Sequence, residues 1–161
     1  LPIFPALPLV VGQYAALLHY GLDGTACGLA WSHLLWVLPY MLLTLIGPYL
    51  AFDSRLLSTA QALGRTRLQA CLYIKWPMLL RPLLAAFAIG FSVSIAQYLP
   101  TLFAGAGRFA TVTTEAVALS AGGNRRVLAV QAVLQVVLPL AAFALTVWLG
   151  HWAGKYRRGL R

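Results

Sequence analysis

The chain has 161 residues, of which 61% are hydrophobic and only 9% are charged, and its mean hydropathy is +0.80. Soluble domains are usually about half apolar and about a quarter charged, so this composition excludes an ordinary soluble fold. Twelve Lys and Arg residues outnumber three Asp and Glu residues, giving a net charge of +9. Because the basic residues lie mainly between and after long apolar runs, they indicate membrane topology signals rather than a nucleic-acid surface.

Four apolar segments predict membrane spans at about 3–20, 27–52, 82–102 and 127–152. A hydrocarbon core about 30 Å thick needs roughly 20 helical residues at about 1.5 Å each, which these segments supply. A tight turn at 21–24, a basic connection at 53–81 and a polar outer connection at 104–126 join them. The predicted fold class is therefore all-α, a polytopic transmembrane helix bundle with short cytoplasmic helices in the 53–81 connection.

Lys and Arg residues set the predicted orientation. The 53–81 connection holds five of them, and a second basic cluster ends the chain at 155–161. Four spans put both clusters on one side, which the positive-inside rule makes the cytoplasm, although Arg108, Arg125 and Arg126 then lie outside. Cys27 and Cys71 fall on opposite sides, so we expect neither a disulfide nor a shared zinc site.

The 53–81 connection has the pattern of two short helices around a glycine. Asp53 or Ser54 is expected to cap the first helix, and Gly64 to end it in the left-handed conformation. Thr66 is expected to cap the second helix and Pro77 to stop it.

Each short helix carries an apolar stripe, which in the first comprises Leu56, Ala60 and Leu63 at i, i+4 and i+7. Two interpretations remain open on this pattern alone. The pair of helices either docks in a groove of another protein or lies among the lipid headgroups.

The same stretch resembles the EAA loop of the binding-protein-dependent, MetI-like ABC importer permeases, whose pattern is Glu-Ala-Ala, three residues, Gly and an apolar-x-apolar-Pro close. The matching residues are Ala60, Leu63, Gly64, Ile74, Trp76 and Pro77, followed by the run Leu79, Leu80, Arg81 and Pro82. Ser58 and Thr59 depart from the pattern, because the family has Glu and Ala there. The missing Glu removes a salt bridge that this position normally offers.

The resemblance extends to both sides of the loop. Residues 38–40, 94–100 and 113–117 are similar to the thiamine and iron(III) branch of the family, and the run 96–123 is similar to one subgroup of that branch. The resemblance implies that two permease halves form the pore, and that each half has more spans than the four visible here. It therefore implies that this chain is the C-terminal part of one half.

The resemblance also implies partners and residue roles. The loop would be the coupling helix that sits in a cleft of a separate ATP-binding cassette subunit. The residues implied in this contact are Ser58, Thr59, Ala60, Leu63, Gly64, Arg65, Arg67, Leu68 and Pro77. A second permease half, a periplasmic substrate-binding protein and membrane lipid are the other expected partners, in a bacterial inner membrane.

Neither a catalytic site nor a metal or cofactor site is expected. The His, Asp and Glu residues are scattered singly, without the i, i+3 or i, i+4 pairing of metal ligands. The run 150–155 is one residue too short for a phosphate-binding loop and lacks its Ser or Thr. We therefore expect ATP hydrolysis on a partner chain.

A polar set in the predicted third span is a candidate solute path. Gly90, Ser94, Gln97 and Thr101 recur at i, i+4, i+7 and i+11, which predicts one helical face. In lipid such a face needs water or a partner helix, so pore lining and interhelical contact both remain open. His33 is a further candidate, because a His inside a span usually faces protein or water.

The sequence thus predicts a permease subunit of an ATP-driven importer. A secondary transporter is one alternative, but it would be expected to bury carboxylates in mid-span, whereas Asp23, Asp53 and Glu115 lie outside the predicted spans. A membrane scaffold protein is the other alternative. It would also have a docking loop, but no polar face within a span.

Overall fold

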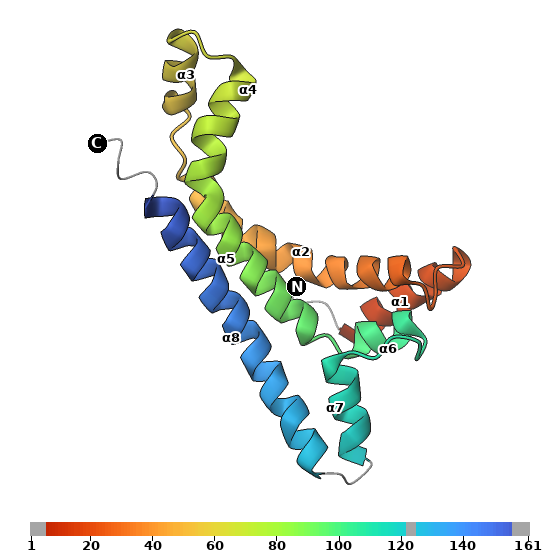
Figure 1. Ribbon diagram of the computed structural model, residues 1–161. Coiled ribbons are helices and arrows are strands. Elements are labelled where there is room, and N and C mark those ends of the chain that lie inside the picture. The colour runs from red at the N-terminus through yellow and green to blue at the C-terminus, as the bar shows by residue number, and fades with distance from the viewer. Residues whose placement is uncertain (1–5, 122–124, 156–161) are drawn as a thin grey trace.

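The computed structural model describes residues 6–121 and 125–155, and every regular element in these ranges is a helix. The elements are α1 (Ala6–His19), α2 (Ala26–Leu50), α3 (Arg55–Ala62), α4 (Arg67–Ala70), the π-helix η1 (Cys71–Lys75), α5 (Trp76–Ile95), α6 (Leu99–Gly105), α7 (Val112–Ala121) and α8 (Arg125–Lys155). Figure 1 shows α5 beside both α2 and α8, with α3 and α4 projecting from one end of the molecule. The prediction of an all-α fold is confirmed.

Three helices within the described residues are long and apolar enough to cross a membrane, namely Ala26–Leu50, Arg67–Ile95 and Arg125–Trp152. The first and last of these correspond to the spans predicted at 27–52 and 127–152. The middle one differs from the predicted span at 82–102, because it begins at Arg67, runs through η1 into α5 and ends at Ile95. The prediction that a helix stops at Pro77 is therefore wrong.

The span predicted at 3–20 corresponds to α1, which has 14 residues. At about 1.5 Å per residue this helix is shorter than the roughly 30 Å of a hydrocarbon core. Its contact with α6 includes Tyr14 and Phe103, whose ring centroids are 5.6 Å apart. Residues 3–5 lie outside the described residues, so a fourth span stays a prediction.

Local chemistry explains where α2 begins. The Thr25 hydroxyl oxygen accepts from the backbone N–H of Gly28 at 3.1 Å and thereby satisfies a free donor in the first turn. The same hydroxyl donates to the Leu22 carbonyl at 2.6 Å. Gly21 and Gly24 have φ of +63° and +60°, a backbone conformation that favours glycine. The tight turn predicted at 21–24 follows from these glycines.

Pro100 explains why α5 does not continue into α6. It is the second residue of α6, it has no N–H to donate, and its ring would clash with the carbonyl of Ala96 in a continuous α-helix. The helix therefore ends at Ile95, whose carbonyl accepts from the Thr113 hydroxyl. The predicted span at 82–102 thus consists of two helices with a break between them.

Helix α5 packs against both α2 and α8, but through different kinds of contact. Toward α2, Gly90 is buried, and a Cβ added to it would lie 2.8 Å from Met41 Sδ and 2.9 Å from Val37 Cγ1. Small residues of this kind let membrane helices approach closely. Toward α8, Arg81 Nε donates to the Gly150 carbonyl at 3.3 Å, near the end of α8 that lies toward α3 and α4.

The predicted outer connection at 104–126 contains regular structure. Its residues form α7, which packs against α8, and α8 itself begins at Arg125. In Figure 1 both α7 and the start of α8 lie at the end of the molecule away from α3 and α4.

Candidate functional site

The candidate site is the hairpin formed by α3, α4 and the residues between them. At its start, Asp53 Oδ1 accepts from the backbone N–H of Arg55 at 2.9 Å. Ser54, at the N-cap of α3, makes no capping hydrogen bond through its side chain. Of the two caps expected from the sequence, Asp53 is the one that satisfies an N–H in the first turn.

The turn at the tip of the hairpin depends on Gly64, whose φ is +86°. The N–H of Gly64 donates to the Gln61 carbonyl at 2.9 Å, and the N–H of Arg65 donates to the Ala60 carbonyl at 3.1 Å. These two bonds form a Schellman motif, which satisfies carbonyls left free at the end of a helix. The prediction that Gly64 ends the first helix in the left-handed conformation is confirmed.

Thr66 begins the second helix through a reciprocal capping box. Its hydroxyl oxygen accepts from the Gln69 N–H at 3.2 Å, and its own N–H donates to Gln69 Oε1 at 3.2 Å. Two free donors at the start of α4 are therefore satisfied. The predicted role of Thr66 as a cap is confirmed.

Small residues are buried in the two arms of the hairpin, whereas large apolar residues are exposed beside the turn at its tip. Ala60 and Ala70 are buried, at 7% and 1% exposure. Leu63 and Leu68, on either side of the turn, are 81% and 71% exposed. The stripe predicted in the first helix is thus divided, because Ala60 is covered while Leu63 points to the surroundings.

The polar residues that the sequence places in the coupling loop are also accessible. The exposed members are Ser58, Thr59, Arg65 and Arg67. The guanidinium carbon of Arg65 lies 5.8 Å from the centroid of the Tyr73 ring, within the range of a cation–π contact. The tip of the hairpin therefore presents two leucines beside two arginines.

Pro77 lies inside the helix that joins the hairpin to the membrane, immediately after η1. The Trp76 N–H donates to the Cys71 carbonyl, five residues earlier, which is the π-helical pattern. This wider turn moves the backbone away from the α-helical geometry in which the ring of Pro77 would clash with the Tyr73 carbonyl. The hairpin and the span consequently form one continuous helix through a proline.

A second group of candidate residues meets at the break between α5 and α6. His33 of α2 lies 2.8 Å from Ser94 Oγ through Nδ1 and 2.8 Å from Thr101 Oγ1 through Nε2. Gln97 Nε2 donates to the His33 carbonyl at 3.3 Å. The sequence did not predict that His33 joins the polar set. The prediction that this set shares one helical face is wrong, because Thr101 belongs to α6.

The two hydrogen bonds of the Thr101 hydroxyl determine which atoms donate in this network. Its hydroxyl donates to the Gln97 carbonyl at 2.7 Å, so its oxygen must accept from His33 Nε2–H. In a neutral imidazole Nδ1 is then an acceptor, which assigns Ser94 as its donor. These bonds connect α2 to both sides of the α5–α6 break, which favours the interhelical role among the two left open by the sequence.

Gln97 has one polar atom outside this network. The residue is 7% exposed, and its buried Oε1 has no hydrogen-bond partner among the residues that the structure describes. Gly90, the fourth member of the predicted polar set, contributes close packing against α2 rather than a polar group. Within residues 6–121 and 125–155, no group of three or more His, Cys, Asp or Glu side chains is arranged to hold a metal ion.

These features define a multi-pass helical membrane protein with a hairpin that projects beyond its spans. The chain is 55% identical to the Inner membrane ABC transporter permease protein YnjC of Escherichia coli (strain K12), over 162 residues that include all of this chain. The matched region is 32% of that protein, so the chain spans about a third of the length of this curated relative. No protein-family model and no solved structure matches the chain.

The similarity and the three apolar helices agree on location. The relative is an inner membrane protein, and the chain has three helices able to cross a bilayer. The chain is therefore a multi-pass protein of the inner membrane, as the sequence predicted.

Proposed function

We propose that the chain is part of the permease subunit of an ATP-driven importer and that its hairpin couples the spans to a separate ATPase. The observation that carries this proposal is the exposed apolar tip formed by Leu63 and Leu68. Burying a leucine side chain is worth roughly 1.5–3 kcal/mol, which a groove on a partner would recover. The similarity to a protein named as an ABC transporter permease supports the same function.

The continuous helix Arg67–Ile95 supports a mechanism of coupling. Closure of two ATPase subunits on ATP would draw the hairpins together, and each hairpin would move the span to which it is joined. Arg65 and Arg67 are exposed beside the apolar tip and would meet acidic side chains of the ATPase. The spans would then alternate between inward-open and outward-open arrangements, with populations set by the nucleotide.

The remaining partners follow from this proposal. A second permease half would complete the pore, and a periplasmic binding protein would deliver the solute. ATP hydrolysis would take place on the ATPase, so this chain would be a non-catalytic membrane subunit. Because the sequence of the hairpin resembles the EAA loop, the hairpin would be the EAA loop of a MetI-like permease in the thiamine and iron(III) branch.

We also propose that the polar network at the α5–α6 break, which joins α2 to α5 and α6, borders the solute path on its other side. Its side chains are His33, Ser94, Gln97 and Thr101, with Gly90 one turn before Ser94. The partnerless Oε1 of Gln97 supports this assignment, because a buried acceptor gains free energy from any donor that a solute or a second half supplies. Neutral polar groups bind a passing solute weakly enough to release it.

Co-purification of the ATPase tests the coupling role. The substitutions Leu63→Ala and Leu68→Ala together should abolish most ATPase retention and most solute uptake, because they remove the apolar tip. The matched control is Leu42→Ala with Leu43→Ala, which truncates two leucines of α2 that are 62% and 70% exposed. Retention of the ATPase by the hairpin variant at the level of the control would refute the proposal.

A further inference from the structure

A cavity lies where the hairpin joins the spans, between α2 and the helix that continues from η1 into α5. Its empty volume, including space open to the surroundings, is about 570 Å³. Leu45, Leu79 and Leu83 line the part nearer the middle of the spans, one or two helical turns inward from the hairpin. Tyr49, Lys75 and Trp76 line the part nearer the hairpin. The cavity surface is thus almost entirely apolar, and Lys75 is among its lining residues.

No carboxylate within the described ranges 6–121 and 125–155 contacts Lys75. Its Nζ donates to the Tyr49 hydroxyl at 3.1 Å and lies 4.3 Å from the centroid of that ring. The Phe52 ring is 5.8 Å away. Asp53, the acid nearest to these rings in sequence, accepts from the Arg55 N–H. Because an ammonium group has three donors, Lys75 keeps donors for a further acceptor.

The aromatic residues beside Lys75 place it at the level of the lipid headgroups. Tyr49 and Trp76 are each 55% exposed. Tyr and Trp concentrate at membrane–water interfaces, where the ring is in contact with lipid and the polar atom with water. The surrounding hairpin is basic, as is the whole chain with its net charge of +9.

We propose that this cavity binds one anionic phospholipid, with the phosphate at Lys75 and an acyl chain along Leu45, Leu79 and Leu83. Charge complementarity selects an anion, and the apolar lining selects a lipid over a soluble phosphate. Basic pockets between transmembrane helices on the cytoplasmic side bind anionic headgroups in this way. The inference depends on membrane insertion and not on the proposed ATPase partner, so each can fail without the other.

Lipid counting by native mass spectrometry tests this site. The purified protein is freed of lipid in detergent and then titrated with dioleoyl phosphatidylglycerol or dioleoyl phosphatidylcholine. The wild type should retain phosphatidylglycerol preferentially. Lys75→Gln should weaken that retention about fivefold, since one basic residue near the surface contributes about that factor. Arg126→Gln, which removes an equal charge from an exposed residue at the far end of α8, should leave retention unchanged.

A second variant separates the acyl chain from the headgroup. Leu83→Phe fills the cavity while keeping Lys75 and should weaken retention of both lipids. Glycerol 3-phosphate in excess should not displace the bound lipid, because it lacks the acyl chain. Equal retention of the two lipids by the wild type, or equal losses for Lys75→Gln and Arg126→Gln, would overturn the proposal. Unchanged retention by Leu83→Phe, or displacement by the soluble phosphate, would also overturn it.

Discussion

Gly64 is the residue on which the hairpin turn depends. Its φ is +86°, and a Cβ added there would meet nothing within 4 Å, so the cost of a side chain is conformational rather than steric. Gly64→Ala should destabilise the turn by roughly 1–2 kcal/mol. If the hairpin couples the ATPase, solute-stimulated ATP hydrolysis in proteoliposomes should fall severalfold. Gly47→Ala is the control, because Gly47 also has open space but lies in a helix.

Equal stimulation in these two variants would contradict the role of the turn. The sequence predicted this turn well, because the Schellman bonds join residues at most five apart in the chain. Gly64 and Thr66 thus specify the tip of the hairpin from local information. Leu63 and Leu68 are exposed for the same reason, since the turn places them at its two ends.

The hydrogen bonds of His33 should contribute measurably to the stability of the protein. A double-mutant cycle between His33→Leu and Thr101→Val should show a coupling of about 0.6 kcal/mol, the average for hydrogen bonds between membrane helices, and of at most about 1.7 kcal/mol. The measurement is unfolding of the purified protein in detergent. Strictly additive losses would mean that the 2.8 Å contact contributes nothing to stability.

The sequence alone could not predict that His33 contacts Ser94 and Thr101. His33 is 61 residues from Ser94 and 68 residues from Thr101 along the chain. Helical spacing relates residues within one helix, and it carries no information on which residue of α2 faces the α5–α6 break. The predicted polar face assumed one continuous helix from Gly90 to Thr101, whereas α5 ends at Ile95 and α6 begins at Leu99.

Among the helices, α2 and α5 depend on close packing at Gly90. Gly90→Ala should destabilise the pair by about 1–3 kcal/mol, because its Cβ would come within 3.0 Å of Val37 and Met41. Val37→Ala should restore much of this loss, since Val37 cannot move aside as the flexible Met41 side chain can. Gly12→Ala is the control, because α1 has nothing within 4 Å of that Cβ. Thermal unfolding of Gly90→Ala, of Gly90→Ala with Val37→Ala, and of Gly12→Ala measures these effects. Equal losses at Gly90 and Gly12 would contradict the packing argument.

Two prolines show why element boundaries were only partly predictable. Pro77 was expected to end a helix, yet the π-helix η1 accommodates it and the helix continues to Ile95. Pro100 was not expected to interrupt one, yet it separates α5 from α6. Both residues lack an N–H, so the outcome depends on whether the preceding turn can widen. Residue type alone does not determine that choice.

For the whole molecule, hydropathy predicted the all-α fold and two of the three long apolar helices with nearly correct bounds. The arrangement of those helices was not predictable, because it depends on contacts such as Gly90 with α2 and Arg81 with Gly150. The continuous helix from Arg67 to Ile95 also depends on the π-helical turn η1, which was not predicted from the sequence. Its consequence is that the hairpin is an extension of a span rather than a separate unit.

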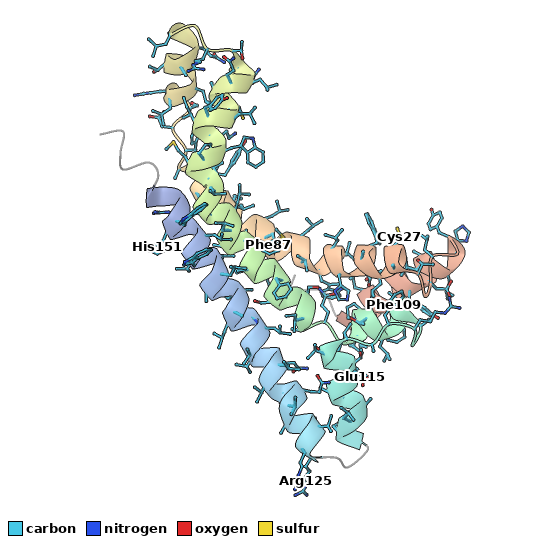
Figure 2. All side chains as sticks on the ribbon, in the orientation of Figure 1. Cys27, Phe87, Phe109, Glu115, Arg125 and His151 are labelled. Atoms are coloured by element: carbon cyan, nitrogen blue, oxygen red, sulfur yellow. The ribbon has the colours of Figure 1, made fainter. Side chains whose placement is uncertain are left out.

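The orientation of the molecule in the membrane is the remaining whole-molecule prediction. The hairpin end carries Arg55, Arg65, Arg67, Lys75 and Arg81, whereas Arg108, Arg125 and Arg126 lie at the other ends of the spans. Figure 2 shows Cys27 at the end of α2 away from the hairpin, and Arg125 at the end of α8 away from His151. The positive-inside rule therefore predicts a cytoplasmic hairpin and an outer Cys27.

Thiol labelling measures this orientation directly. A protein whose single cysteine is Cys27, which is exposed, should react with a membrane-impermeant maleimide in cells with a permeabilised outer membrane. A protein whose single cysteine comes from Leu63→Cys should react only after the inner membrane is opened, because that residue is 81% exposed and lies on the side predicted to be cytoplasmic. Opened cells serve as the control, since both proteins should label there. Labelling of Leu63→Cys with the inner membrane intact would place the hairpin outside, where no cytoplasmic ATPase could reach it.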